Sequence, residues 1–156
     1  MDKTATRWRF LLCIFVLTTF IIAGDNAYGK DDKVNPKEYG VYVKTEKDLK
    51  RLLTNIAFTS EEGVYYIEPN NPARFVLKDV EYFVFYGQYE FEYLTLNSMV
   101  FFQAALGKPS FVFGKTVEAN LKKVGTNLYT YKPKGLLGRG YYSLWINDSA
   151  WDFILD

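Results

Sequence analysis

Paired carboxylates are the first residues of this sequence whose type and spacing could do chemistry. Glu90 and Glu92 lie two positions apart in a run that alternates aromatic and acidic residues. On a β-strand this spacing puts both side chains on one face, about 7 Å apart, where two carboxyl groups could act as general acid and base. The same alternation is typical of a solvated strand face opposite buried rings, and we favour that interpretation.

A short oxygen-rich segment is the second candidate. Asn147, Asp148 and Ser149 could contribute ligands to a hard cation such as calcium. The segment lacks the spaced acidic ligands of a calcium loop, however, and these three residue types are common in tight turns because they hydrogen-bond their own backbone. We therefore predict a turn here, and neither a metal nor a cofactor.

The residue types that are missing exclude several chemistries. The sequence has no His, and its single Cys is Cys13. Ser-His-Asp and Cys-His nucleophiles, zinc sites built from Cys and His, and disulfides within the chain are therefore excluded. We accordingly expect a protein that is not an enzyme.

The surplus of aromatic side chains points to binding instead. Phe, Tyr and Trp make up 19% of the chain. Tyr and Trp rings can stack on sugars, although such rings more often fill the core of a small β-domain. Neighbouring residues of a strand point to opposite faces, so part of the set should remain outside. The candidates for a carbohydrate platform are Tyr65, Tyr66, Tyr141, Tyr142, Trp145 and Trp151.

Charge is nearly balanced overall but is segregated along the chain. The net charge of +1 gives no reason to expect nucleic acid as a partner. Residues 61–96 carry seven acidic and two basic side chains, whereas residues 108–139 carry seven basic and one acidic. The basic segment could form an edge that meets an anionic surface such as lipid headgroups or acidic polysaccharide. We favour the alternative, in which opposite charges pair across neighbouring strands.

Residues 1–29 have the pattern of an export signal. Three basic residues precede an apolar stretch at 10–23, whose fourteen residues are fewer than the roughly 20 that a membrane-spanning helix needs. Small residues place the cleavage after Gly29 or Gly24. The alternative is an uncleaved N-terminal membrane anchor. The sequence thus predicts an exported protein, periplasmic or extracellular.

The rest of the chain predicts strands that position the candidate residues. Residues 30–38 are polar and charged, which indicates a flexible N-terminal segment, and residues 39–156 are expected to form a single β-rich domain. Short runs of aromatic and β-branched residues, separated by turn residues, recur from residue 58 onward. This pattern predicts a mainly β fold, an antiparallel β-sandwich or small barrel with at most one or two short helices.

Three segments need a separate prediction. In residues 45–55, leucines at helical spacing follow a capping pattern of Thr45 and Asp48, which favours a short helix, with a turn and a second strand as the alternative. Residues 88–96 alternate as a half-buried strand does. Residues 98–106 fit either a strand or a helical turn.

The two ends of this domain resemble a class of uncharacterised exported bacterial β-sandwich proteins. The segment 36–43 (PKEYGVYV) carries the resemblance near the start of the domain. At the other end, 137–144 (LGRGYYSL) and 151–153 (WDF) are similar to an L-x-P-G-x-Y-x-L ending followed by an aromatic-D-F triplet, with Arg139 in place of Pro. The resemblance implies a bacterial β-sandwich of unknown function and brings no catalytic or binding residue.

Together these observations predict an exported, envelope-associated binding or interaction module without catalytic activity. Its partner would be an unknown envelope protein or a glycan. The alternative is a carbohydrate-binding β-sandwich that uses exposed Tyr and Trp. Nucleic acid is not expected, and membrane contact is expected only through an uncleaved leader or a basic edge.

Overall fold

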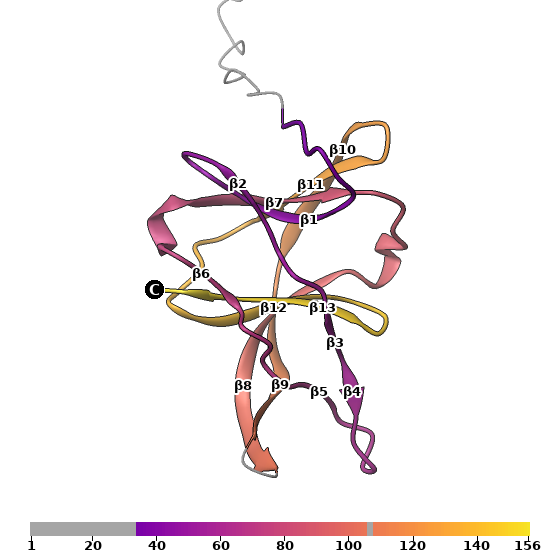
Figure 1. Ribbon diagram of the computed structural model, residues 1–156, viewed down its shortest axis with the longest axis vertical. Helices are drawn as coiled ribbons and strands as arrows, with labels where there is room; N and C mark the ends of the chain where they lie inside the picture. Colours follow the sequence, from indigo (N-terminus) through magenta and orange to yellow (C-terminus); the bar gives the residue numbers. More distant parts are fainter. Residues whose placement is uncertain (1–33, 106–107) are drawn as a thin grey trace, which may run out of the picture. The chain divides into compact units, whose positions relative to one another are not determined.

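The protein is all β in the part that the computed structural model describes, residues 34–105 and 108–156. Residues 35–156 form one compact unit of thirteen strands and two 3₁₀ turns, without an α-helix among the described residues (Figure 1). Within the same residues, no helix has the length and apolarity that crossing a membrane requires. Residues 1–29, where an export signal is predicted, and residues 30–33 of the segment 30–38 lie outside the described residues.

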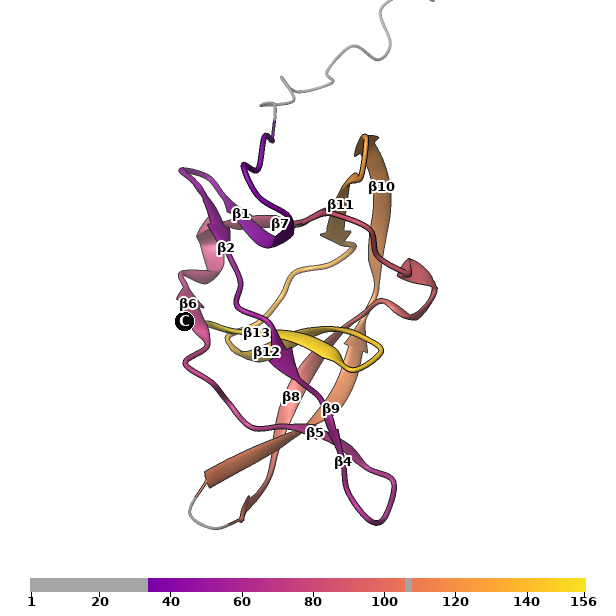
Figure 2. The same cartoon turned by 45° about the vertical axis from the view of Figure 1, so that its right-hand side comes forward.

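Five strands form an antiparallel sheet in the order β10-β11-β7-β1-β2. Figure 2 shows these strands together, above the β12–β13 hairpin. The two 3₁₀ turns, η1 and η2, lie before and after β7 in the chain. The elements are β1 (Gly40–Thr45), β2 (Leu49–Arg51), β7 (Val80–Tyr86), β10 (Ala119–Gly125), β11 (Leu128–Pro133), η1 (Leu77–Asp79) and η2 (Phe91–Tyr93).

The second sheet nearly closes into a seven-stranded barrel. Its strand order is β3-β13-β12-β8-β9-β5-β4, and β6 pairs in parallel with β13. Only Ala57 separates β3 from β4 in the chain, so the two ends of this path lie next to each other. The prediction of a mainly β fold is therefore confirmed. The strands are β3 (Asn55–Ile56), β4 (Phe58–Thr59), β5 (Tyr65–Ile67), β6 (Ala73–Phe75), β8 (Thr95–Ala105), β9 (Lys108–Val117), β12 (Gly140–Ile146) and β13 (Ser149–Leu155).

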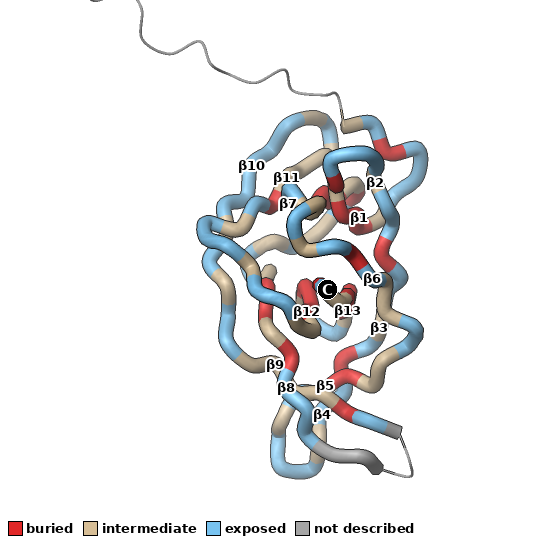
Figure 3. The backbone as a smooth tube through the Cα atoms, turned by 90° about the vertical axis from the view of Figure 1, so that its left-hand side faces the viewer, coloured by how far each residue is buried: buried red, intermediate tan, exposed pale blue. Residues whose placement is uncertain are grey.

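The hairpin of β12 and β13 separates two cores and is buried on both faces. Because side chains alternate along a strand, Tyr142, Leu144 and Ile146 of β12 contribute to the larger core, and Tyr141 and Trp145 pack against the smaller one. The buried positions accordingly concentrate on this hairpin, on β1 and on β7 (Figure 3).

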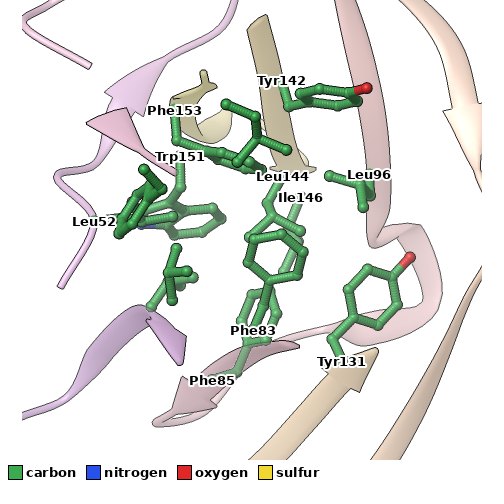
Figure 4. Close-up of a cluster of buried hydrophobic side chains, with 14 residues drawn as sticks. Leu52, Phe83, Phe85, Leu96, Tyr131, Tyr142, Leu144, Ile146, Trp151 and Phe153 are labelled. Atoms are coloured by element: carbon green, nitrogen blue, oxygen red, sulfur yellow. The ribbon is translucent and has the colours of Figure 1, made fainter. Parts of the chain in front are cut away.

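Aromatic rings dominate the larger core, which lies between the five-stranded sheet and the β12–β13 hairpin (Figure 4). The ring centroids of Phe83 and Phe153 are 5.2 Å apart, and Phe153 stacks on Tyr142 at 5.9 Å. The rings of Phe85 and Trp151 form a T-shaped pair with centroids 6.2 Å apart. Rings from both sheets therefore interdigitate, as the packing of two sheet faces requires.

The helix expected at 45–55 is wrong, and the alternative of a turn and a second strand is correct. The Thr45 backbone N–H donates to the Asp48 carbonyl (2.9 Å), and the Asp48 N–H donates to Thr45 Oγ1 (3.1 Å). These bonds close a hairpin turn between β1 and β2 rather than cap a helix. The leucine spacing was misleading because Leu52 enters the core while Leu53 is exposed.

The strand expected at 88–96 is also wrong for residues 88–94, and only Thr95 and Leu96 belong to a strand, β8. Residues 91–93 form the 3₁₀ turn η2, in which the Leu94 N–H donates to the Phe91 carbonyl (3.1 Å). The turn lets Phe91 contact Phe85 at 5.5 Å and Tyr129 at 4.5 Å. Residues 98–105, by contrast, continue as part of β8, which decides between strand and helical turn for this segment.

Candidate functional site

An open cleft on the barrel collects aromatic rings and oxygen acceptors. Its volume is about 520 Å³. The strands β5, β8 and β12 contribute to it together with η2 and the turn between β12 and β13. The lining residues are Tyr65, Glu92, Tyr93, Thr95, Trp145, Asn147 and Asp148.

The Trp145 ring is held in place on several sides. It stacks on Phe113 of β9, with ring centroids 4.5 Å apart and planes 20° apart, and lies 5.1 Å from the Tyr65 ring. Its indole N–H donates to the backbone carbonyl of Asn147. An indole fixed in this way loses little conformational entropy when a ligand binds to it.

Two tyrosines add exposed ring surface next to this indole. Tyr65 is 45% exposed and Tyr93 is 58% exposed. Each presents an apolar ring and a hydroxyl group that can donate or accept a hydrogen bond. The cleft therefore offers flat apolar surface with polar groups at its margin.

The charged groups of the cleft are all acidic. Glu92 and Asp148 are exposed, and Lys and Arg do not occur among the residues that line the cleft. Asn147 and Asp148 form the two-residue connection of the β12–β13 hairpin, in which Ile146 pairs with Ser149. Asn147 has φ of 52°, in the left-handed region that Asn tolerates, and the predicted tight turn is confirmed.

The six aromatic residues proposed from sequence have different positions in the structure. Tyr65 and Trp145 lie in the cleft. Tyr142 and Trp151 are buried in the larger core, where the Trp151 indole N–H donates to Thr54 Oγ1 (3.0 Å). Tyr66 stacks on Phe58 at 5.6 Å, and Tyr141 packs inside the barrel against Phe111 at 4.8 Å.

Tyr93 and Asp148 were not among the residues proposed for the platform. Tyr93 belongs to the alternating run that predicts a strand, and only the turn η2 brings it to the cleft. Asp148 is correctly placed in a turn by sequence, but its proximity to Glu92 depends on which strands are neighbours. The alternating residues around the 3₁₀ turn Phe91–Tyr93 predict a strand and give no signal of the turn.

A second polar group lies inside the barrel and ties its strands together. Asp152 is 5% exposed and accepts hydrogen bonds from the Tyr141 hydroxyl (2.5 Å) and from Asn55 Nδ2 (3.2 Å). The same amide nitrogen of Asn55 donates to the Glu68 carbonyl (2.8 Å). The network thus joins β12 and β13 to β3 and to the end of β5, close to where the barrel closes.

This network makes the stability of the fold sensitive to high pH. Burial, together with the hydrogen bond to Asp152 and its charge, raises the pKa of Tyr141 above its ordinary value of 10.0. A raised folded-state pKa gives a stabilisation that is fully present below the unfolded pKa and is lost as the pH rises toward the folded one. Above pH 10 the free energy of unfolding should therefore fall, by up to about 1.4 kcal/mol per pH unit for this tyrosine.

Urea unfolding at pH 9, 10 and 11 measures this effect. The variant Tyr141→Phe should show a smaller loss of the free energy of unfolding between pH 10 and pH 11. The loss should not disappear, because burial raises the pKa of Tyr89 and Tyr131 as well. Identical losses in the two proteins would show that Tyr141 ionises equally easily in the folded and unfolded states.

The segregated charges pair less than the sequence suggests. The acidic and basic segments do lie side by side, because β7 pairs with β11 and β5 with β9. Two ion pairs of the described side chains run elsewhere, however: Glu81 lies 3.7 Å from Lys44, and Glu118 lies 3.2 Å from Lys134 within the basic segment. Neither of these two pairs joins the acidic segment to the basic segment, as the sequence led us to expect.

Comparison of the chain with models of protein families, with curated proteins and with solved structures gave no match.

Proposed function

We propose that the protein is a non-catalytic binding module that takes a carbohydrate in the cleft of Tyr65, Tyr93 and Trp145. The observation that carries the proposal is a fixed indole beside two exposed tyrosines, with carboxylate and amide groups at the same cleft. The export pattern at 1–29 and the resemblance of the domain's ends to exported bacterial proteins extend the proposal to a glycan of the cell envelope.

The chemistry of a sugar matches the two kinds of surface in this cleft. A pyranose ring has an apolar face of C–H groups that can pack on an aromatic ring, and hydroxyl groups around its edge. Glu92 and Asp148 can accept hydrogen bonds from those hydroxyls. A volume of about 520 Å³ falls within the range of about 300–1,000 Å³ that is usual for small-molecule sites.

The carboxylates of the cleft favour binding over hydrolysis. Glycoside hydrolysis needs two carboxyl groups in different environments, one of which holds a proton. Glu92 and Asp148 are both exposed to water at the margin of an open cleft. Glu90, the partner considered from sequence, is exposed too and precedes the turn η2 rather than sharing a strand face with Glu92.

Removing one ring of the cleft is expected to weaken glycan binding by about tenfold or more. For a glycan found by screening a panel of envelope and plant polysaccharide fragments, Tyr93→Ala should raise Kd by this factor, which is about 1.4 kcal/mol. The matched control is Tyr39→Ala, because Tyr39 is 61% exposed and Tyr93 is 58% exposed. Tyr39 packs on Tyr86 of the five-stranded sheet and does not line the cleft.

Isothermal titration calorimetry on both variants decides the proposal. Equal affinities of Tyr93→Ala and Tyr39→Ala for the glycan would place the binding site elsewhere. Measurable release of reducing sugar during the titration would contradict the non-catalytic part of the proposal, and a further variant, Glu92→Gln, would then test the carboxylate.

A further inference from the structure

A second concave surface lies at the ends of β11 and β13 and shares no lining residue with the cleft of Tyr65, Tyr93 and Trp145, which we call the aromatic cleft. Its volume is about 860 Å³. The lining comes from two stretches of chain, 76–81 and 132–139, together with the C-terminal residue Asp156. We call this surface the basic groove.

The floor of the basic groove is apolar and continuous with the larger core. Leu77, Val80 and Leu137 line the groove and also pack against the buried residues of that core. Val76 is 50% exposed, and Leu136 is fully exposed. Apolar surface that stays open to water at a hollow favours an occupant with an apolar part, since covering it releases the water.

The margin of the groove carries positive charge that the fold does not neutralise. Lys78, Lys132 and Arg139 are exposed, and among the described side chains none of them has a carboxylate within ion-pair distance. Four basic residues line the groove, the fourth being Lys134, which pairs with Glu118 at 3.2 Å.

The two acidic side chains that line the groove, Glu81 and Asp156, already have cationic partners from outside it. Arg74 binds Asp156 through two contacts, at 2.5 Å and 3.0 Å. Lys44 lies 3.7 Å from Glu81. Neither Arg74 nor Lys44 lines the groove, so both acids are compensated without using its own lysines and arginine.

We propose that the basic groove binds a single anionic amphiphile, a molecule with one aliphatic chain and a carboxylate head. The chain would cover Leu77, Val80 and Leu137, and the head would lie at Lys132 and Arg139. Charge complementarity favours an anion, and the apolar floor of the hollow favours a single molecule whose aliphatic chain lies along that floor. The proposal for the basic groove does not rest on the proposed carbohydrate binding, because the groove and the aromatic cleft share no lining residue.

Titration of the full-length protein with dodecanoate, decanoate and dodecanol tests this site. Dodecanoate should bind with one molecule per chain and at least tenfold more tightly than the uncharged dodecanol. Each added methylene should tighten binding about fourfold, which corresponds to ~0.8 kcal/mol, so dodecanoate should exceed decanoate by about 15-fold. All titrations stay below the concentration at which the probe forms micelles.

Two double charge-reversal variants test whether dodecanoate binds at the basic groove or elsewhere on the protein. The double variant Lys132→Glu/Arg139→Glu should weaken dodecanoate binding at least tenfold. The matched control, Lys47→Glu/Lys115→Glu, reverses two exposed lysines that do not line the groove and should bind as the unmodified protein does. Because both variants keep residues 1–29, any binding of the amphiphile to that apolar segment cancels in the comparison.

Two results would overturn the proposal. One is equal binding of dodecanoate to the groove variant and to the control variant, provided that both have unchanged melting temperatures. The other is binding to vesicles of anionic phospholipid without binding of free dodecanoate, because the surface would then dock on a membrane through the exposed Leu136.

A third variant, Leu137→Ser, should weaken dodecanoate binding without changing the charge of the groove.

Discussion

The variant Phe153→Ala is expected to lose about 3–5 kcal/mol of the free energy of unfolding. Phe153 is fully buried at the centre of β13, where its ring contacts Phe75 at 6.4 Å, Phe83 at 5.2 Å and Tyr142 at 5.9 Å. These partners come from both sheets and from the short strand β6. Alanine would therefore leave a cavity that the surrounding strands cannot fill without separating from their hydrogen-bonded neighbours.

Urea denaturation followed by tyrosine and tryptophan fluorescence measures this loss. The same substitution at an exposed position, Phe101→Ala, serves as the control, because Phe101 is 59% exposed and its ring centroid lies 5.7 Å from that of Phe111. The control should change the free energy of unfolding by less than about 1 kcal/mol. Comparable losses in the two variants would contradict the position of Phe153 in the core.

The second large effect is expected at the buried carboxylate inside the barrel. The variant Asp152→Ala should cost about 2–4 kcal/mol, because it leaves the Tyr141 hydroxyl without its acceptor and removes one of the two acceptors of Asn55 Nδ2. Asp152→Asn keeps an acceptor oxygen and the side-chain shape, and should cost less than Asp152→Ala.

The control for the carboxylate is an acid on the same hairpin. Asp148 is exposed, so Asp148→Ala should change the free energy of unfolding by no more than about 0.5 kcal/mol. If Asp152→Ala and Asp152→Asn were both as stable as the unmodified protein, the hydrogen bonds across the closure of the barrel would contribute nothing to its stability.

The fold class was predictable from sequence because strand signals are local. Aromatic and β-branched runs between turn residues indicate strands wherever they occur, and the Asn147–Asp148 turn is specified by its own residues. The errors arose where packing decides the conformation. Leucines at 49, 52 and 53 have helical spacing, yet Leu52 is the one that the core buries. Phe91 turns into the core through a 3₁₀ turn that alternation cannot reveal.

The candidate site was only partly predictable, because the exposure of a strand residue depends on whether another part of the fold covers the sheet face to which its side chain points. Tyr141 and Tyr142 look equivalent in sequence, and both β12 and β13 turn out to be covered on both faces. Trp151 therefore belongs to the core, whereas Trp145 at the end of β12 reaches the cleft. Tyr93 joins the cleft through the turn η2, which sequence alone did not indicate.

The aromatic cleft and the basic groove are surfaces of opposite charge, and the charge segments of the sequence supply only part of each: Glu92 comes from residues 61–96, and Lys132 and Arg139 come from residues 108–139. The aromatic cleft has acidic groups from residue 92 and residue 148, and the basic groove has uncompensated cations at 78, 132 and 139. A neutral or cationic glycan suits the first surface, and an anionic amphiphile suits the second. The two proposals predict that each ligand binds while the other site is occupied.

Nuclear magnetic resonance of the tryptophan indole groups tests the carbohydrate site most directly. In a ¹H–¹⁵N titration with the best glycan of the panel, the Trp145 indole N–H resonance should shift, because this group lies at the cleft and donates to Asn147. The Trp151 indole, buried and bonded to Thr54, should remain unchanged. The variants Trp145→Phe and Trp151→Phe assign these two signals among the three tryptophans of the chain. A glycan that binds while the Trp145 resonance stays in place, or a panel in which no glycan shifts it, would contradict the proposed function.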